Sequence, residues 1–199
     1  MQLSAKMVRE RLAHMKPRLT NCSLETSRKG QNAVGELMRA VHHGQVRVKH
    51  HDFENFEGAW VLPDDPRRDG TILYLHGGGY TCGGLEYALG FGAALADECG
   101  AKVFCAAYRL APEFPFPAAV EDAAQAYEYL LKKGYAPEKI SLCGESAGGG
   151  LCFALCLYLR QQGLPLPGSI VAISPWTDLT FSGESFETNK ECDVSLSRE

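Results

Sequence analysis

The stretch Ser141-Leu-Cys-Gly-Glu-Ser-Ala-Gly-Gly149 contains a Gly144-x-Ser146-x-Gly148 pattern. The apolar residues of 140–144 predict a buried strand, and residues 147–160 predict a helix. A serine placed between them lies on a sharp strand-to-helix turn, where glycines two residues away on either side avoid backbone clashes. The pattern therefore predicts an exposed, nucleophilic Ser146 hydroxyl at the end of a parallel strand.

Other elements follow from the hydrophobic pattern along the chain. Helices are expected over residues 3–16, ended by Pro17, and over 26–43, ended by Gly44. Alternating residues 46–51 and the segment 58–62 predict two paired strands. From Thr71 onward strands and helices alternate, with strands at 71–75, 102–108, 139–143 and 169–174 and helices at 87–98, 117–133 and 147–160. This order indicates an α/β fold with a mostly parallel sheet covered on both faces, and the first two helices form an N-terminal helical lid.

Composition excludes several classes of protein. The 199-residue chain is 45% hydrophobic and 22% charged with a formal net charge of -4, so nothing in its charge favours nucleic acid as a partner. No apolar run reaches the roughly 20 residues of a membrane span, and residues 1–19 lack the apolar core of a signal peptide. The eight cysteines match no zinc pattern. We expect them to be reduced packing residues in a cytoplasmic protein without metal or cofactor.

A run of three glycines follows another predicted buried strand. Strand 71–75 leads directly into His76-Gly77-Gly78-Gly79-Tyr80. Glycines at this position allow backbone N–H groups to face a ligand without side chains in the way. Together with the later Gly-x-Ser-x-Gly pattern, the loop predicts an oxyanion hole, to which the N–H of Ala147 contributes at a helix N-terminus. His76 is expected to hold the loop in shape.

Five segments in this order resemble the hormone-sensitive-lipase family of carboxylesterases, which have the α/β-hydrolase fold. The segments are His76-Gly-Gly-Gly-Tyr80, Tyr108-Arg-Leu-Ala-Pro-Glu113, Phe116-Pro-Ala-Ala-Val-Glu-Asp122, Gly144-Glu-Ser-Ala-Gly-Gly149 and Ser174-Pro-Trp-Thr-Asp178. The resemblance implies that Ser146 is the nucleophile. It also implies an oxyanion hole of Gly77, Gly78, Gly79 and Ala147, in which Gly77 shapes the loop and the others donate. Glu145 stands where the family usually has aspartate.

The remaining catalytic partners have no clear candidates. In this fold the acid and the histidine follow the nucleophile in the chain, but all six histidines precede Ser146. Asp178 is a weak candidate acid, since its Pro-x-x-Asp context favours a turn residue, and Asp193 is weaker still. Residues 195–199 resemble a helix start. We therefore expect a core without its last strands and helices, with the triad acid and base beyond residue 199, supplied by a second chain or fragment or lost.

The sequence supports two hypotheses about function. The first is a hydrolase of short-acyl carboxylic esters, divided into a cap over residues 1–44 and an α/β core over residues 45–199. The second is a small-molecule-binding protein or an inactive truncated hydrolase that uses the same pocket. Amide hydrolysis requires the same residues and stays open, as does a homodimer.

Overall fold

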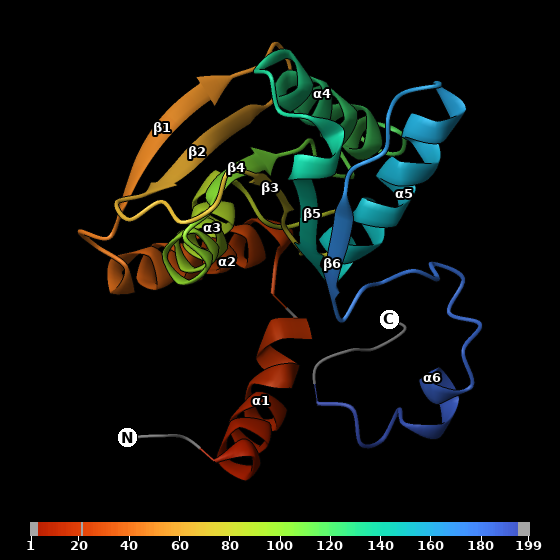
Figure 1. The fold of residues 1–199 in the computed structure, drawn as a ribbon. Helices are drawn as coiled ribbons and strands as arrows, with labels where there is room; N and C mark the ends of the chain where they lie inside the picture. The colour runs from red at the N-terminus through yellow and green to blue at the C-terminus, as the bar shows by residue number, and fades with distance from the viewer. Residues whose placement is uncertain (1–3, 21, 195–199) are drawn as a thin grey trace. The chain divides into compact units, whose positions relative to one another are not determined.

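The computed structural model describes residues 4–20 and 22–194, and its centre is a mixed six-stranded sheet (Figure 1). The strands lie in the order β1-β2-β4-β3-β5-β6. β4, β3, β5 and β6 are parallel, whereas β2 is antiparallel to both β1 and β4. Their bounds are β1 Val46–Asp52, β2 Glu57–Pro63, β3 Thr71–Leu75, β4 Lys102–Ala107, β5 Ile140–Glu145 and β6 Ser169–Ile173.

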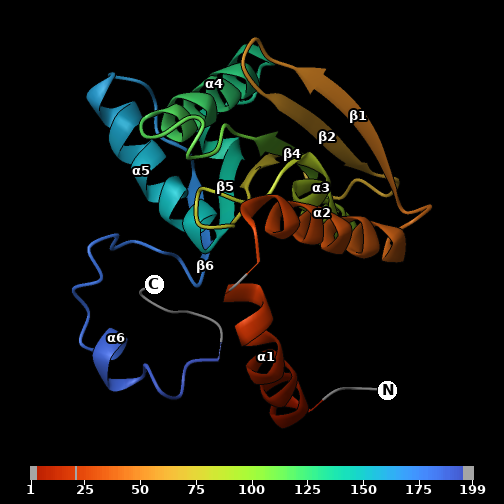
Figure 2. The same cartoon turned by 180° about the vertical axis from the view of Figure 1, so that it is seen from behind.

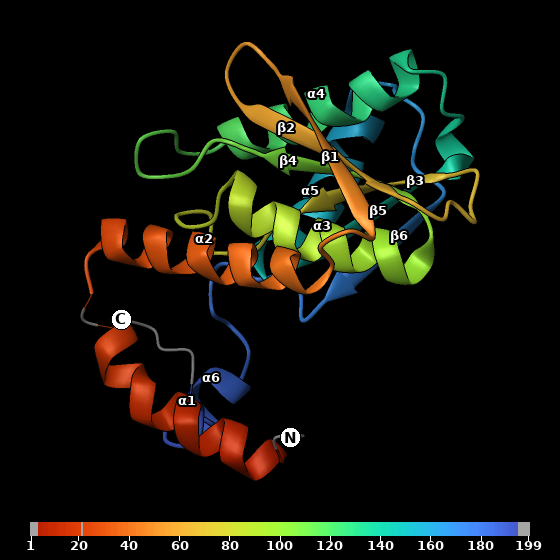
Figure 3. The ribbon, with the colours of Figure 1, turned by 90° about the vertical axis from the view of Figure 1, so that its left-hand side faces the viewer.

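The helices after β3 cover the two faces of the sheet. α3 (Leu85–Cys99) packs on one face, and α4 (Ala118–Lys132) and α5 (Ala147–Gln161) pack on the other (Figures 2 and 3). β4 lies on one side of β3 and β5 on the other, so right-handed crossovers carry α3 and α4 to opposite faces. The carboxyl ends of β3 and β5 therefore form a topological switch point, where open α/β sheets bind ligands.

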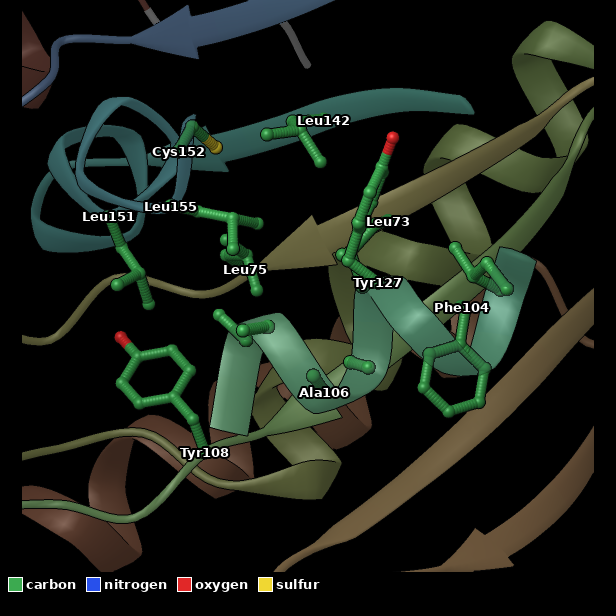
Figure 4. Close-up of a cluster of buried hydrophobic side chains, with 14 of the residues drawn as sticks. Leu73, Leu75, Phe104, Ala106, Tyr108, Tyr127, Leu142, Leu151, Cys152 and Leu155 are labelled. Carbon is green, nitrogen blue, oxygen red and sulfur yellow. The ribbon is translucent and has the colours of Figure 1, made fainter. Parts of the chain in front are cut away.

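The core has two layers because side chains alternate along each strand. On β3, Leu73 and Leu75 face α4 and α5, while Tyr74 faces α3. Figure 4 shows the first of these layers, in which Leu142 of β5 and Leu155 of α5 join the β3 leucines. All four leucines are fully buried, and each contributes roughly 1.5–3 kcal/mol through burial.

α2 (Leu24–Val41) crosses α3 at a pair of glycines. A Cβ on Gly35 would meet the backbone of Glu86 and Tyr87, and one on Gly90 would meet the backbone of Gly35. The two helices touch backbone to backbone at this crossing. Side chains of any size at either position would force the helices apart.

The contacts divide the chain into two compact units, residues 28–177 and a smaller one made of residues 1–27 and 178–199. In the smaller unit, the guanidinium of Arg9 donates to the Cys192 carbonyl over 2.9 Å and the Lys16 ammonium donates to the Asp193 carbonyl over 2.7 Å. The unit contains α1 (Ala5–Thr20) and the single turn α6 (Ser185–Thr188). The division into a cap of residues 1–44 and a core of residues 45–199 stays a prediction.

Most predicted elements are confirmed, and the exceptions have physical reasons. The sheet is mostly parallel with helices on both faces, and the six predicted strands are present within one or two residues. The expectation that Pro17 ends the first helix is wrong, because α1 continues to Thr20. Proline's fixed φ fits a helix, and its main cost there is one missing N–H bond plus local crowding. The helix start predicted at residues 195–199 lies outside the described residues.

Candidate active site

Ser146 lies at a strained turn between β5, which ends at Glu145, and α5, which begins at Ala147. Its backbone has φ 53° and ψ -121°, a combination that costs a non-glycine residue about 1–3 kcal/mol. Hydrogen bonds on both sides hold this conformation. The Ser146 N–H donates to the Ile173 carbonyl over 3.0 Å, and the Ser146 carbonyl accepts from the N–H groups of Gly150 (3.0 Å) and Trp176 (2.8 Å). The turn is therefore anchored to β6 and the segment that follows it.

The glycines two residues from Ser146 are required by close backbone contacts. A Cβ on Gly148 would meet the carbonyl oxygens of Leu75 and His76 at the end of β3. One on Gly144 would meet the carbonyl of Gly148. The start of α5 thus sits directly against the start of the glycine loop, and only glycine at both positions permits this approach.

The glycine loop presents two unoccupied backbone donors. Gly78 and Gly79 have φ values of 122° and 61°, both in the region that favours glycine. The Gly78 carbonyl accepts from the N–H groups of Thr81 (3.1 Å) and Cys82 (2.8 Å), which closes the loop into a tight turn. Within residues 4–20 and 22–194, the N–H groups of Gly78 and Gly79 donate to no backbone acceptor. They are available for a ligand.

Ala147 offers a third donor beside Ser146. As the first residue of α5, it has no acceptor one turn earlier in the helix. The positive end of the helix dipole also favours an anion at this point. The Ser146 hydroxyl makes no hydrogen bond to any described side chain, so no histidine within this part of the chain is bonded to it.

Glu145 joins the serine turn to the glycine loop. Its carboxylate accepts from the Gly77 N–H and from the Tyr74 hydroxyl, each over 2.6 Å. The Gly77 N–H is therefore engaged within the protein, as expected of a residue that shapes the loop. Burial raises the pKa of Glu145, although the bonds from Tyr74, Gly77 and Tyr87 oppose the shift. The glutamate that replaces the usual aspartate thus spans β5, β3 and the loop.

His76 is fully buried behind the loop. Its Nδ1 lies 2.8 Å from the Gly77 carbonyl, and its ring stacks on Tyr108 with centroids 4.3 Å apart. Burial lowers the pKa of His76 to about 4, so the ring is neutral near pH 7 and Nδ1–H is the donor to Gly77. The Tyr108 hydroxyl donates to the His76 carbonyl over 2.6 Å. These contacts fix both the ring and the backbone of His76, the residue at which the loop begins.

Sequence reasoning missed two polar residues, one that contacts the segment after the glycine loop and one that anchors the segment after β4. Arg28 of α2 donates to the carbonyls of Thr81 (2.7 Å) and Ala111 (3.0 Å) and forms a two-bond ion pair with Glu113. Fully buried Asp122 accepts from the backbone and guanidinium of Arg109, directly after β4. A lone arginine in a helix gives no signal in the sequence. Asp122 lies within a quoted motif, but only the fold shows its partner.

Asp178 belongs to the smaller unit and caps a local turn. Its two carboxylate oxygens accept from the backbone N–H groups of Thr180 and Ser182, each over 2.9 Å, and from both hydroxyls. These bonds, the Ser182 hydroxyl first, lower the pKa of Asp178. Such a geometry is typical of an aspartate in a turn.

Comparisons with known proteins agree with this architecture. A family described as the alpha/beta hydrolase fold matches residues 72–198. An acetyl-hydrolase from Streptomyces hygroscopicus is 48% identical over 138 residues, which is 69% of this chain and 46% of that protein. Human hormone-sensitive lipase is 37% identical over 125 residues, 60% of this chain and 12% of that protein.

A solved structure supports the same assignment. A hormone-sensitive-lipase homologue from a metagenome library superposes with a TM-score of 0.87 at 31% identity, covering 99% of this chain and 65% of that one. This chain thus spans about half the length of the acetyl-hydrolase and less than two thirds of the solved homologue. No helix among residues 4–20 and 22–194 is both long and apolar enough to cross a bilayer. The chain belongs to the α/β-hydrolase fold family and, within it, resembles the esterases of the hormone-sensitive-lipase type.

Proposed function

We propose that this chain carries the nucleophile and the oxyanion hole of a serine hydrolase for short-acyl carboxylic esters. The observation that carries the proposal is the strained Ser146 turn beside a glycine loop with two unoccupied N–H donors. A binding protein has no need to keep a serine in a costly conformation at the switch point of the sheet. The similar acetyl-hydrolase and hormone-sensitive lipase support the same class of reaction.

In this proposal the Ser146 Oγ attacks the ester carbonyl carbon while a general base accepts its proton. The carbonyl oxygen becomes an oxyanion that accepts from the N–H groups of Gly78, Gly79 and Ala147. Collapse of the intermediate breaks the bond to the alcohol oxygen, which leaves with that proton, and water then cleaves the acyl-enzyme. No described histidine bonds Ser146, so in this proposal the triad histidine and its acid come from outside the described residues.

The test combines labelling and turnover in the full protein with a matched variant. A fluorophosphonate should label the wild type once and leave Ser146→Ala unlabelled. Hydrolysis of p-nitrophenyl acetate should fall at least about 10³-fold in that variant. Activity that survives Ser146→Ala contradicts the proposal. Saturable binding of p-nitrophenyl butyrate without labelling or turnover instead supports the binding-protein alternative.

A further inference from the structure

A second concave site lies in the unit 28–177, at the edge of the sheet formed by β1 and β2. It is a groove of about 650 Å³ between β1, β2 and the end of α4. Ser146 follows β5, and β4 and β3 lie between β2 and β5 in the sheet. Neighbouring strands are about 4.8 Å apart, so β2 and β5 are separated by about 14 Å, and none of the groove's lining residues belongs to the glycine loop or the serine turn. The groove is therefore separate from the glycine loop and independent of the proposed function.

Aromatic rings form the walls of this groove. The Trp60 Nε1–H donates to the Tyr129 hydroxyl over 3.0 Å, and the Tyr135 ring lies 5.9 Å from the Trp60 ring. His51 stacks on Tyr129 with centroids 4.2 Å apart and an interplanar angle of 20°. His51 is opposite Gly58 in the β1–β2 pairing, and the Phe104 ring of β4 fills the space where a side chain at Gly58 would lie. The rings hold one another in place before any ligand arrives, and Trp60, at 9% exposure, contributes only an edge to the groove.

Positive charge surrounds these rings. Lys49, Lys102 and Lys133 line the groove, against Asp69 as the one carboxylate in its lining. Among the described residues, none of the three lysines has a carboxylate within 4 Å. The Lys133 ammonium instead lies 5.3 Å from the centre of the Tyr129 ring. Lysines around an ordinary aromatic core more often extend into solvent, but here they share one cavity of a size typical of small-molecule sites, about 300–1,000 Å³.

We propose that this groove binds a small planar aromatic anion, with an aromatic carboxylate as its simplest form. The ring of the ligand packs against Tyr135 and the exposed edges of Trp60 and Tyr129, and its carboxylate meets the ammonium groups of the lysines that line the groove. Both halves of the ligand are needed. The rings alone would accept neutral aromatic molecules, and the lysines alone would attract any anion weakly from solvent.

The experiment uses 4-nitrobenzoate, which quenches tryptophan fluorescence, with 4-nitrobenzyl alcohol as its neutral counterpart. The sequence has two tryptophans, so Trp176→Phe leaves Trp60 as the sole reporter. Quenching by 4-nitrobenzoate should saturate, and the neutral alcohol should bind at least about five-fold more weakly. Isothermal titration calorimetry of the unsubstituted chain provides the same constants if Trp176→Phe fails to fold.

Charge variants complete the test. Lys49→Gln and Lys133→Gln should each raise the dissociation constant about three- to five-fold, as expected for loss of up to about 1 kcal/mol from an exposed charge pair. Lys132→Gln is the matched control, because it removes the same charge at the neighbouring position. Lys132 pairs with Glu128 and does not line the groove. Quenching without saturation, equal binding of the alcohol, or equal effects of Lys132→Gln and Lys133→Gln would overturn the proposal.

Discussion

The carboxylate of Glu145 accepts the Gly77 N–H over 2.6 Å, which ties the residue before the candidate nucleophile to the first glycine of the loop. The two residues are 68 positions apart in the chain and meet because β5 and β3 are neighbours in register. The same carboxylate also accepts the Tyr74 hydroxyl from β3. The Glu145 side chain is therefore one of the contacts that set the spacing between Ser146 and the donors of the loop.

Removing this side chain should impair turnover more than substrate binding. Glu145→Ala leaves the Gly77 N–H and the Tyr74 hydroxyl without their acceptor, so the loop can shift relative to Ser146. A misplacement of about 1 Å can cost about 10²-fold in rate, and we expect a fall in kcat of that order with little change in KM. Steady-state kinetics of the full protein with p-nitrophenyl acetate measure both constants.

Glu145→Gln is the informative companion to this variant. The amide retains one oxygen acceptor but cannot accept at both positions, so we expect a smaller fall in kcat, about 10-fold, from the loss of one charge-assisted bond. If Glu145→Ala and the wild type have the same kcat, the carboxylate does not position the loop.

The low pKa of His76 should make the folded protein less stable in mild acid. The pKa of His76 is about 4 in the folded chain, below the ordinary value of 6.5, so the unfolded state binds the proton first as pH falls. The stability contributed by neutral His76 is complete above pH 6.5 and is lost as pH falls through 4. The difference between these two pKa values corresponds to about 3 kcal/mol in the free energy of unfolding.

Thermal melts between pH 4 and 7 can isolate this effect by comparison with His76→Asn. The amide of asparagine can replace Nδ1–H as the donor to Gly77 but does not titrate. The variant should be less stable than the wild type at pH 7 and should lose less stability on acidification. The raised pKa of Glu145 makes stability change with pH in the opposite direction. Both proteins contain Glu145, so this contribution cancels when the pH profile of the variant is subtracted from that of the wild type. Parallel pH profiles for the two proteins would contradict the assignment.

Gly148→Ala should strongly disturb the serine turn. The new Cβ would meet the carbonyl oxygens of Leu75 and His76, which are backbone atoms that cannot rotate away. We expect a loss of about 3 kcal/mol in the free energy of unfolding, at the upper end of the usual cost of overpacking. Denaturant unfolding measures this change.

Gly30→Ala serves as the control for Gly148→Ala. Gly30 lies within α2 with no atom within 4 Å of an added Cβ, so alanine there should stabilise the helix by up to about 1 kcal/mol. Similar effects of the two substitutions would show that the close approach at Gly148 is not tight in solution.

Arg28→Lys should loosen the segment after the glycine loop without removing its charge. Lysine cannot reproduce the fork that reaches Thr81, Ala111 and Glu113 together, so at least one carbonyl loses its donor. We expect faster amide hydrogen exchange at residues 81–82 and a loss of about 1–2 kcal/mol in stability. Arg47→Lys is the control, since its ion pair with Asp64 is exposed and should change little. Equal exchange in both variants contradicts a role for Arg28 at the loop.

The sequence by itself determined the elements whose pattern is local. The apolar run 71–75 is β3 to the residue, and the strand, glycine and helix signals around Ser146 predicted the turn that the structure contains. These features depend on neighbouring residues, through side-chain alternation and the conformational freedom of glycine. Another local rule, that proline ends a helix, was wrong at Pro17, because the helix continues to Thr20.

Only the tertiary structure decided which distant residues meet. The strand order β4-β3-β5 brings the Gly77 N–H to Glu145, and no periodicity in the sequence encodes that pairing. The aromatic groove likewise joins His51 of β1 to Tyr129 of α4, 78 positions later. Contacts of this kind depend on crossover handedness and on packing of whole layers, which are properties of the folded chain and not of any short segment.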